Sequence, residues 1–125
     1  MATAAQLRKL ALALPETQEK SHFGQPDFRV RGKIFAGLSQ DEKRGTLKLT
    51  PEIQAMVIDA KPEAFAPAAG AWGRSGWTHV HLQHVEVGAL RDLLLEAFRL
   101  VAPKRVLAAL SGTAGPKASK PRGRR

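Results

Sequence analysis

Apolar residues recur at helical spacing in several stretches of the chain. The first stretch follows Thr3, whose side chain fits a capping box with that of Gln6, and its stripe of leucines ends before Pro15. A second helix is expected to begin at Thr50, because threonine is a preferred N-cap and a proline follows it. The remaining helical stretches are a last helix over residues 85–102 and a short helical turn over 104–110.

In other stretches apolar and polar residues alternate one by one, and this two-residue repeat predicts strands. The strand-like runs are 27–31, 33–38, 46–50 and 77–82. Polar residues 41–45 are expected to form a hairpin loop, and residues 61–76, rich in Ala, Pro and Gly, a longer loop. The predicted order α-β-β-β-α-β-α indicates an α+β fold, a two-layer sandwich with the first and last helices on one face of an antiparallel sheet. The other sheet face would be left to solvent or to a partner.

Length and composition narrow the class of protein. A chain of 125 residues predicts one domain over residues 1–110, followed by a disordered tail over 111–125 that is rich in Gly, Pro, Ser, Lys and Arg. The absence of cysteine excludes disulfides, thiolate catalysis and cysteine-bound zinc or iron–sulfur clusters. No apolar run approaches the ~20 residues of a membrane span, and the N-terminus resembles a helix rather than a secretion signal. A cytoplasmic monomer without a membrane partner is therefore expected.

The charge of the chain is strongly positive, and a large part of it lies in the tail. Twenty Lys and Arg residues oppose eleven Asp and Glu, for a net charge of +9. The tail contributes Lys117, Lys120, Arg122, Arg124 and Arg125 and no acid. Such a balance favours polyanionic partners and predicts phosphate contacts that weaken with salt. The alternatives for the tail are a solubilising segment or a targeting address.

Strand parity predicts a basic and aromatic surface on the sheet. If the helices cover the face of Phe28, Leu47 and Val80, the alternation places six other side chains on the opposite face. These are Arg29, Arg31, Lys48, Trp77, His79 and His81. Lys33 and Phe35 would join them in one of the two registers that the pattern leaves open for residues 33–38. The loop over 70–76 is expected to be a flap that carries Trp72 and Arg74.

These residues allow two readings. Phosphates would meet the cations and an unstacked base could lie on an indole ring, as in nucleic-acid binding. Alternatively, the Arg and Lys residues only solvate an open sheet, Trp77 packs in the core, and the loop is an ordinary connection.

Catalytic and metal-binding motifs are weak by comparison. His79, His81 and His84 lie close in sequence, but no carboxylate is near them before Glu86, so no metal and no cofactor are expected. The sequence has no nucleophile elbow, P-loop or dinucleotide fingerprint, which favours a protein that is not an enzyme.

Four segments resemble the MmcQ/YjbR family of small bacterial proteins. They are FGQPDFRVRGKIFAGL (23–38), LKLTPE (47–52), FAPAAGAWGRSGWTHVHL (65–82) and AFRLVAPKRVLAAL (97–110), and the resemblance covers nearly all of residues 4–110. The resemblance implies a CyaY-like (frataxin-like) sandwich. It also implies DNA binding through a double wing, with wing-like hairpins around residues 39–46 and in the loop before Trp77. Iron-binding frataxins use an acidic first helix, whereas this one carries Arg8 and Lys9, so iron is not expected.

Two functional hypotheses follow. The first is a non-enzymatic nucleic-acid (DNA) binding module that uses the basic sheet face, the wing-like loops and the tail. The alternative is a domain that binds a small molecule or a protein in the cleft between the sheet face and the Gly-rich segment 70–76. A purely structural accessory protein is a third reading.

Overall fold

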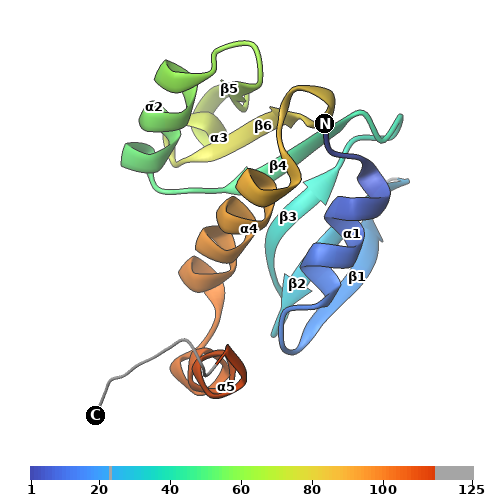
Figure 1. Ribbon diagram of the computed structural model, residues 1–125, viewed down its shortest axis with the longest axis vertical. Coiled ribbons are helices and arrows are strands. Elements are labelled where there is room, and N and C mark those ends of the chain that lie inside the picture. Colours follow the sequence, from blue (N-terminus) through green and yellow to red (C-terminus); the bar gives the residue numbers. More distant parts are fainter. Residues whose placement is uncertain (23, 115–125) are drawn as a thin grey trace.

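The computed structural model describes residues 1–22 and 24–114, and within them it forms two layers (Figure 1). One layer is an antiparallel sheet with the strand order β1-β2-β3-β4-β6-β5. The strands are β1 (Thr17–His22), β2 (Gln25–Val30), β3 (Lys33–Leu38), β4 (Arg44–Lys48), β5 (Phe65–Pro67) and β6 (Trp77–His81). The helices are α1 (Ala4–Leu12), α2 (Pro51–Ala60), α3 (Gly70–Arg74), α4 (Val87–Val101) and α5 (Lys104–Ala114), with a 3-10 turn at Leu82–His84. The predicted α+β sandwich is confirmed.

Helices α1 and α4 pack on one face of this sheet and on each other (Figure 1). Phe28, Leu47 and Val80 point toward them from three strands and are inaccessible to solvent. Phe98 of α4 completes the core and meets the edge of Phe35 at a ring-centroid distance of 5.7 Å. Burial of these apolar side chains is the main favourable contribution to folding. The expected packing of helices on one sheet face is confirmed.

A bulge between β2 and β3 decides the ambiguous register of residues 33–38. Phe28 lies opposite Ala36, but Arg29 lies opposite Ile34, so Phe35 has no partner in the ladder. Phe35 and Ala36 are consequently both buried, although they are neighbours in the chain. Ile34 instead shares the face of Arg29, away from the helices.

The predicted starts of the first two helices are confirmed. Thr3 and Gln6 form a reciprocal capping box, and the Thr50 side chain accepts a hydrogen bond from the Ile53 N–H at 3.1 Å. Helix α1 ends at Leu12 rather than just before Pro15. A left-handed residue at Glu16 (φ 57°) then turns the chain into β1.

Four elements differ from the sequence prediction. Strand β1 is an edge strand whose sequence shows little alternation of apolar and polar residues, so the alternation pattern did not predict it. Strand β5 has three residues, too few for a pattern. Residues 70–74, expected in a loop, form α3. The backbone of α5 is helical to Ala114, past the expected domain boundary at residue 110, and the rest of the tail lies outside the described residues.

No helix in residues 1–22 and 24–114 is long and apolar enough to cross a membrane.

Candidate functional site

The sheet surface that faces away from α1 and α4 carries the candidate residues, and we call it the open face. The ladder between β4 and β6 pairs Lys48 with Trp77, Thr46 with His79 and Arg44 with His81. The bulged ladder adds Ile34 beside Arg29, with Asp27 two residues before it. The predicted placement of Arg29, Lys48, Trp77, His79 and His81 on one face is therefore confirmed.

An aromatic corner lies at one end of the open face. The rings of Trp72 and Trp77 meet nearly edge to face, with centroids 5.7 Å apart. Lys48 Nζ lies 5.4 Å from the centroid of the Trp77 ring, within the range of a cation–π contact. Trp77 is half-buried, whereas Trp72 is 66% exposed, an unusual state for so large an apolar side chain.

A hollow of about 530 Å³ opens beside the two indoles, and we call it the tryptophan hollow. It is lined by Gly32, Lys33, Ile34, Thr46, Lys48, Ala68, Trp72, Trp77 and Val101. Most of these groups are apolar, and the two lysines supply the charge. The hollow can therefore hold a flat apolar group with a negative charge at its edge.

Two glycines allow α3 to bring Trp72 onto the sheet. A Cβ at Gly73 would overlap the carbonyl oxygen of Ala68, and a Cβ at Gly76 would overlap that of Leu49. Only residues without a side chain permit these close approaches. The segment expected to be a flap is thus a short helix held against β5 and β6.

Helix α2 also holds this corner in place. The Gln54 side-chain amide donates to the carbonyl of Gly73 at 2.9 Å and to that of Trp77 at 3.1 Å. One side chain therefore ties α2 to α3 and to the first residue of β6.

Arg29 contributes less charge to the open face than the sequence suggested. Its guanidinium binds both carboxylate oxygens of the buried Asp27, at 2.7 and 3.1 Å, and Asp27 raises the pKa of Arg29. In the described part of the chain, Lys33, Arg44 and Lys48 have no acidic partner within ion-pair distance. These side chains, together with the exposed Lys20, which pairs with Asp27 across the β1–β2 ladder, supply positive charge that Arg29 does not.

Arg31 does not lie on the open face, which corrects the parity prediction. Val30 pairs with Lys33, so Arg31 and Gly32 form a two-residue hairpin turn, both with positive φ. The Arg31 guanidinium binds Glu16 at 2.7 Å, beside the turn between α1 and β1. Parity fails here because the strand has already ended.

The other candidate residues are dispersed. Arg74 is exposed on α3 but does not line the tryptophan hollow. The tail cations Lys117, Lys120, Arg122, Arg124 and Arg125 lie outside the described residues. Sequence reasoning missed Arg44, because residues 41–45 were assigned to a loop, although Arg44 continues the parity of Thr46 and Lys48.

Histidines occupy the opposite end of the open face. His79 Nδ1 lies 3.0 Å from the Thr46 hydroxyl, and the pKa of His79 is lowered by burial and then by the charges of Arg44 and His81. The rings of His81 and His84 are 6.3 Å apart. No group of three His, Cys, Asp or Glu side chains suited to a metal ion occurs in the residues that the structure covers.

The family assignment and the fold agree with known proteins. The YjbR family model matches residues 12–100. The crystal structure of a Deinococcus radiodurans protein with a DUF419 domain is 27% identical, with a TM-score of 0.74 over 98% of this chain and 95% of that chain. A Pseudomonas syringae protein at 20% identity shares the fold, with a TM-score of 0.61 over 77% of this chain and 96% of its own. No curated protein matches this chain.

Proposed function

This chain belongs to the YjbR family, and we propose that it is a non-enzymatic, cytoplasmic nucleic-acid-binding module whose open face receives an unpaired strand of DNA or RNA. The observation that carries the proposal is the exposed Trp72, which stands against Trp77 at the edge of an apolar hollow with two lysines. The DNA-binding role implied by the family resemblance points to the same class of ligand.

An unpaired strand fits this surface better than a duplex. A splayed base presents a flat ring that stacks on an indole, whereas the bases of a duplex are already stacked on each other. The phosphates on either side of such a base would contact Lys33 and Lys48 at the hollow and Arg44 farther along β4. In this proposal the two wings are the hairpin around residues 39–46 and the segment before Trp77.

The net charge of the chain supports the same proposal. A charge of +9 attracts polyanions over distances longer than any contact. The five tail cations would add phosphate contacts with little sequence preference. Binding should therefore combine one aromatic contact in the tryptophan hollow with salt-sensitive contacts elsewhere.

Fluorescence anisotropy with a labelled single-stranded oligonucleotide tests the proposal. We expect measurable affinity at about 50 mM salt and a steep loss by about 200 mM. Trp72→Ala should weaken binding about tenfold, because it removes one stacked base. Met56→Ala is the matched control, since Met56 is 62% exposed on α2, outside the open face.

A full-length variant with glutamine at the five tail cations separates the tail from the open face. Tenfold weakening by Trp72→Ala in this variant too would assign the aromatic contact to the folded domain. Undetectable binding of every oligonucleotide at low salt, or equal affinities for Trp72→Ala and Met56→Ala, would contradict the proposal.

A small aromatic anion is a second candidate ligand for the same hollow. The volume of about 530 Å³ falls within the range of small-molecule sites, about 300–1,000 Å³, and the lining is mostly apolar. NMR discriminates between the two: a mononucleotide that shifts the indole signals of Trp72 and Trp77, in a protein that binds no oligonucleotide, would favour this candidate.

A further inference from the structure

A second hollow, also of about 530 Å³, lies at the other end of the open face, beside the β3–β4 hairpin. It is lined by Gln25, Ser39, Gln40, Asp41, Lys43, Arg44, His81, Gln83 and His84, and we call it the hairpin hollow. None of these residues lines the tryptophan hollow. Trp77 and His81 are four residues apart on β6, which places the two hollows about 13 Å from each other along the strand.

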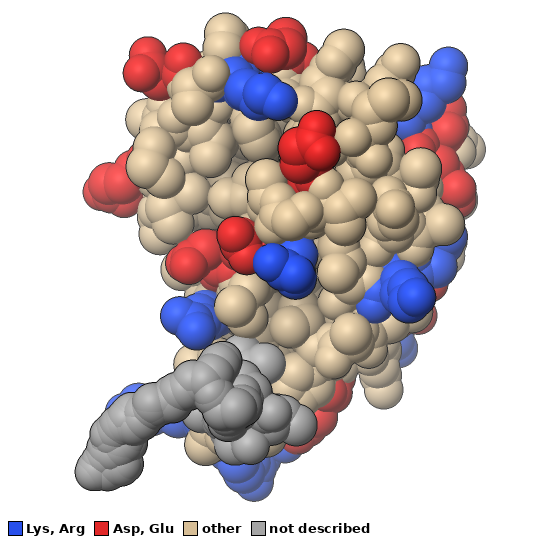
Figure 2. Space-filling model, viewed as in Figure 1, with Lys and Arg blue, Asp and Glu red and all other residues tan. Residues whose placement is uncertain are grey.

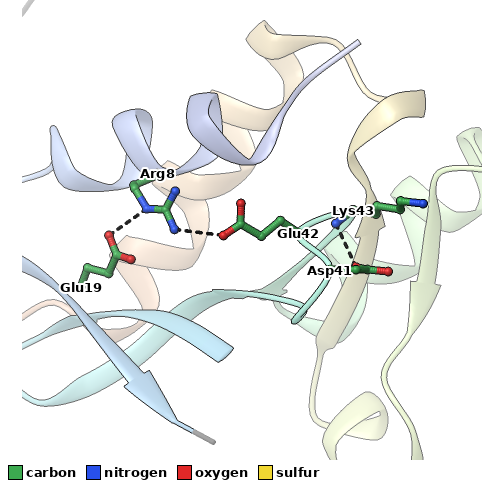
Figure 3. A network of polar contacts seen from close by, with 5 residues as sticks. All are labelled: Arg8, Glu19, Asp41, Glu42 and Lys43. Atoms are coloured by element: carbon green, nitrogen blue, oxygen red, sulfur yellow. Dashed lines mark hydrogen bonds and ion pairs between the residues drawn. The ribbon is translucent and has the colours of Figure 1, made fainter. Parts of the chain in front are cut away.

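The two cations of the hairpin hollow form no close ion pair, although both interact electrostatically with the carboxylate of Asp41. Neither the Lys43 nor the Arg44 side chain forms an ion pair within residues 1–22 and 24–114. Glu42, between Asp41 and Lys43, turns to the opposite side of the hairpin and binds Arg8 at 3.5 Å (Figure 3). Arg8 also binds Glu19 at 2.9 Å, so Glu42 takes part in an ion-pair network outside the lining of the hollow.

Asp41 is the one acid among the lining residues, and its carboxylate is already engaged. It accepts a hydrogen bond from the Ser39 hydroxyl at 2.7 Å. It accepts another from the Lys43 backbone N–H at 3.0 Å (Figure 3). The Ser39 bond and then the Lys43 bond lower the pKa of Asp41, so it is ionised at neutral pH. Its role is to hold the hairpin that presents Lys43 and Arg44.

The other lining groups are hydrogen-bond donors. Gln25, Gln40 and Gln83 offer amide N–H groups, and the imidazoles of His81 and His84 offer ring N–H groups. Burial, and then the charges of Arg44 and His81, lower the pKa of His79, which lies two residues before His81 on β6. Cations and amide donors around a polar hollow suit an oxyanion rather than an apolar ligand.

We propose that the hairpin hollow binds the phosphate group of a phosphate monoester, with the guanidinium of Arg44 and the ammonium of Lys43 as its charged contacts. A monoester carries nearly two negative charges at neutral pH and an internal diester phosphate one, so the monoester interacts more strongly with the two cations, part of whose charge is offset by the ionised Asp41. Arg44 can bind two phosphate oxygens at once, and the imidazoles and amides bind the remaining oxygen. This site does not depend on nucleic-acid binding in the tryptophan hollow.

Inorganic phosphate is the probe for the test. The full chain is titrated with phosphate at low ionic strength while NMR follows the imidazole signals of His81 and His84 and the indole signal of Trp72. We expect saturable shifts at both imidazoles and none at the indole. Shifts that grow linearly with phosphate, or that are larger at Trp72, would overturn the proposal.

Two variants assign the charged contacts, and a third serves as control. Arg44→Gln should weaken phosphate binding about tenfold, because it removes a charge-assisted hydrogen bond. Lys43→Gln, at the exposed hairpin, should weaken it severalfold and does not disturb the ladder. Arg91→Gln replaces an exposed arginine on α4 and should leave the affinity unchanged. Equal affinities for all three variants would refute the assignment.

The phosphate can belong to a small metabolite or to the end of a nucleic acid, and competition distinguishes the two. A sugar phosphate that displaces inorganic phosphate indicates a metabolite, and an oligonucleotide that competes only with a 5′-terminal phosphate indicates a strand end. If neither displaces inorganic phosphate, the hollow is not a monoester site. Phosphate binding together with unchanged oligonucleotide affinity in Trp72→Ala would overturn the proposed function alone.

Discussion

The two faces of one sheet differ in almost every physical property. On the face under α1 and α4, Phe28, Leu47 and Val80 are fully buried and touch other apolar groups. On the open face, Lys48, Trp77 and His79 are half-buried and leave polar or aromatic groups in reach of solvent. Because side chains alternate along a strand, the same strands carry both surfaces. Neighbouring residues of one strand therefore serve different purposes, because one packs in the core and the next lies on the candidate binding surface.

The distribution of charge also differs between the two sides. On the helix side, acids and bases are interspersed over the surface (Figure 2). On the open face, Asp27 neutralises Arg29, whereas Arg44 and Lys48 form no ion pair within the described residues. An interspersed surface favours solubility, whereas uncompensated cations near hollows favour a bound anion.

The largest expected effect is a loss of stability on truncating a core side chain beneath the helix-covered face. Phe98→Ala removes a fully buried ring that packs on Phe35, and should lower the free energy of unfolding by about 3–5 kcal/mol. Leu100→Ala on the same helix, at a side chain 43% exposed, should cost less than about 1 kcal/mol. Urea denaturation measures both values, and equal losses would show that α4 does not cover a core.

A glycine substitution tests how α3 is held against the sheet. Gly73→Ala places a Cβ onto the Ala68 carbonyl and should cost about 1–3 kcal/mol, because α3 must move away. The shift should also separate the two indoles and change the fluorescence of Trp72. Gly88→Ala, where nothing lies within 4 Å of the new Cβ, should leave stability equal or slightly higher. A normal unfolding midpoint and spectrum for Gly73→Ala would contradict the close approach.

Removal of the Asp27–Arg29 ion pair should increase the positive charge of the open face. Asp27→Asn should lower stability by about 1 kcal/mol, since it breaks a charge-assisted pair, and tighten oligonucleotide binding about threefold at low salt. Glu16→Gln is the matched control, because it frees Arg31, which lies in a turn away from the open face. Anisotropy titrations compare the two, and an equal gain in both would mean that only net charge matters.

The smallest expected effect concerns the titration of His79. Burial and neighbouring cations lower its pKa, so on acidification the unfolded chain takes up a proton before the folded chain does. Stability from this group is present above the ordinary histidine pKa of about 6.5 and declines as the pH falls below it toward the lowered pKa of the folded state. His79→Gln should show a flatter dependence of the urea midpoint on pH. Parallel curves for the two proteins would rule out His79 as the source.

Much of the architecture was predictable because local physical rules agree with the fold. Thr3 and Thr50 cap helices as their side chains dictate. The alternation in β4 and β6 placed Lys48, Trp77 and His79 on one face, as the ladder confirms. Strand β1 was not predictable, because an edge strand needs few apolar residues and so leaves little periodic trace.

The candidate site depended more on contacts between distant segments. Parity placed Arg29 on the open face, but it did not show that Asp27 neutralises it, nor that Arg31 turns toward Glu16. Composition indicated a flexible Gly-rich loop, whereas Gly73 and Gly76 serve to bring α3 close to the backbone of other elements. In both cases the residue type indicated a special role, but the sequence did not show which distant residue it would contact.

The amino-acid sequence by itself indicated the family through its segments, and it determined the α+β class and the shared face of Lys48, Trp77 and His79, because caps and alternation act over a few neighbouring residues. Only the tertiary structure decided which cations remain uncompensated and where the two hollows lie. Charge pairing and cavities depend on side chains that meet through space from segments far apart in the chain, and no local pattern encodes those meetings.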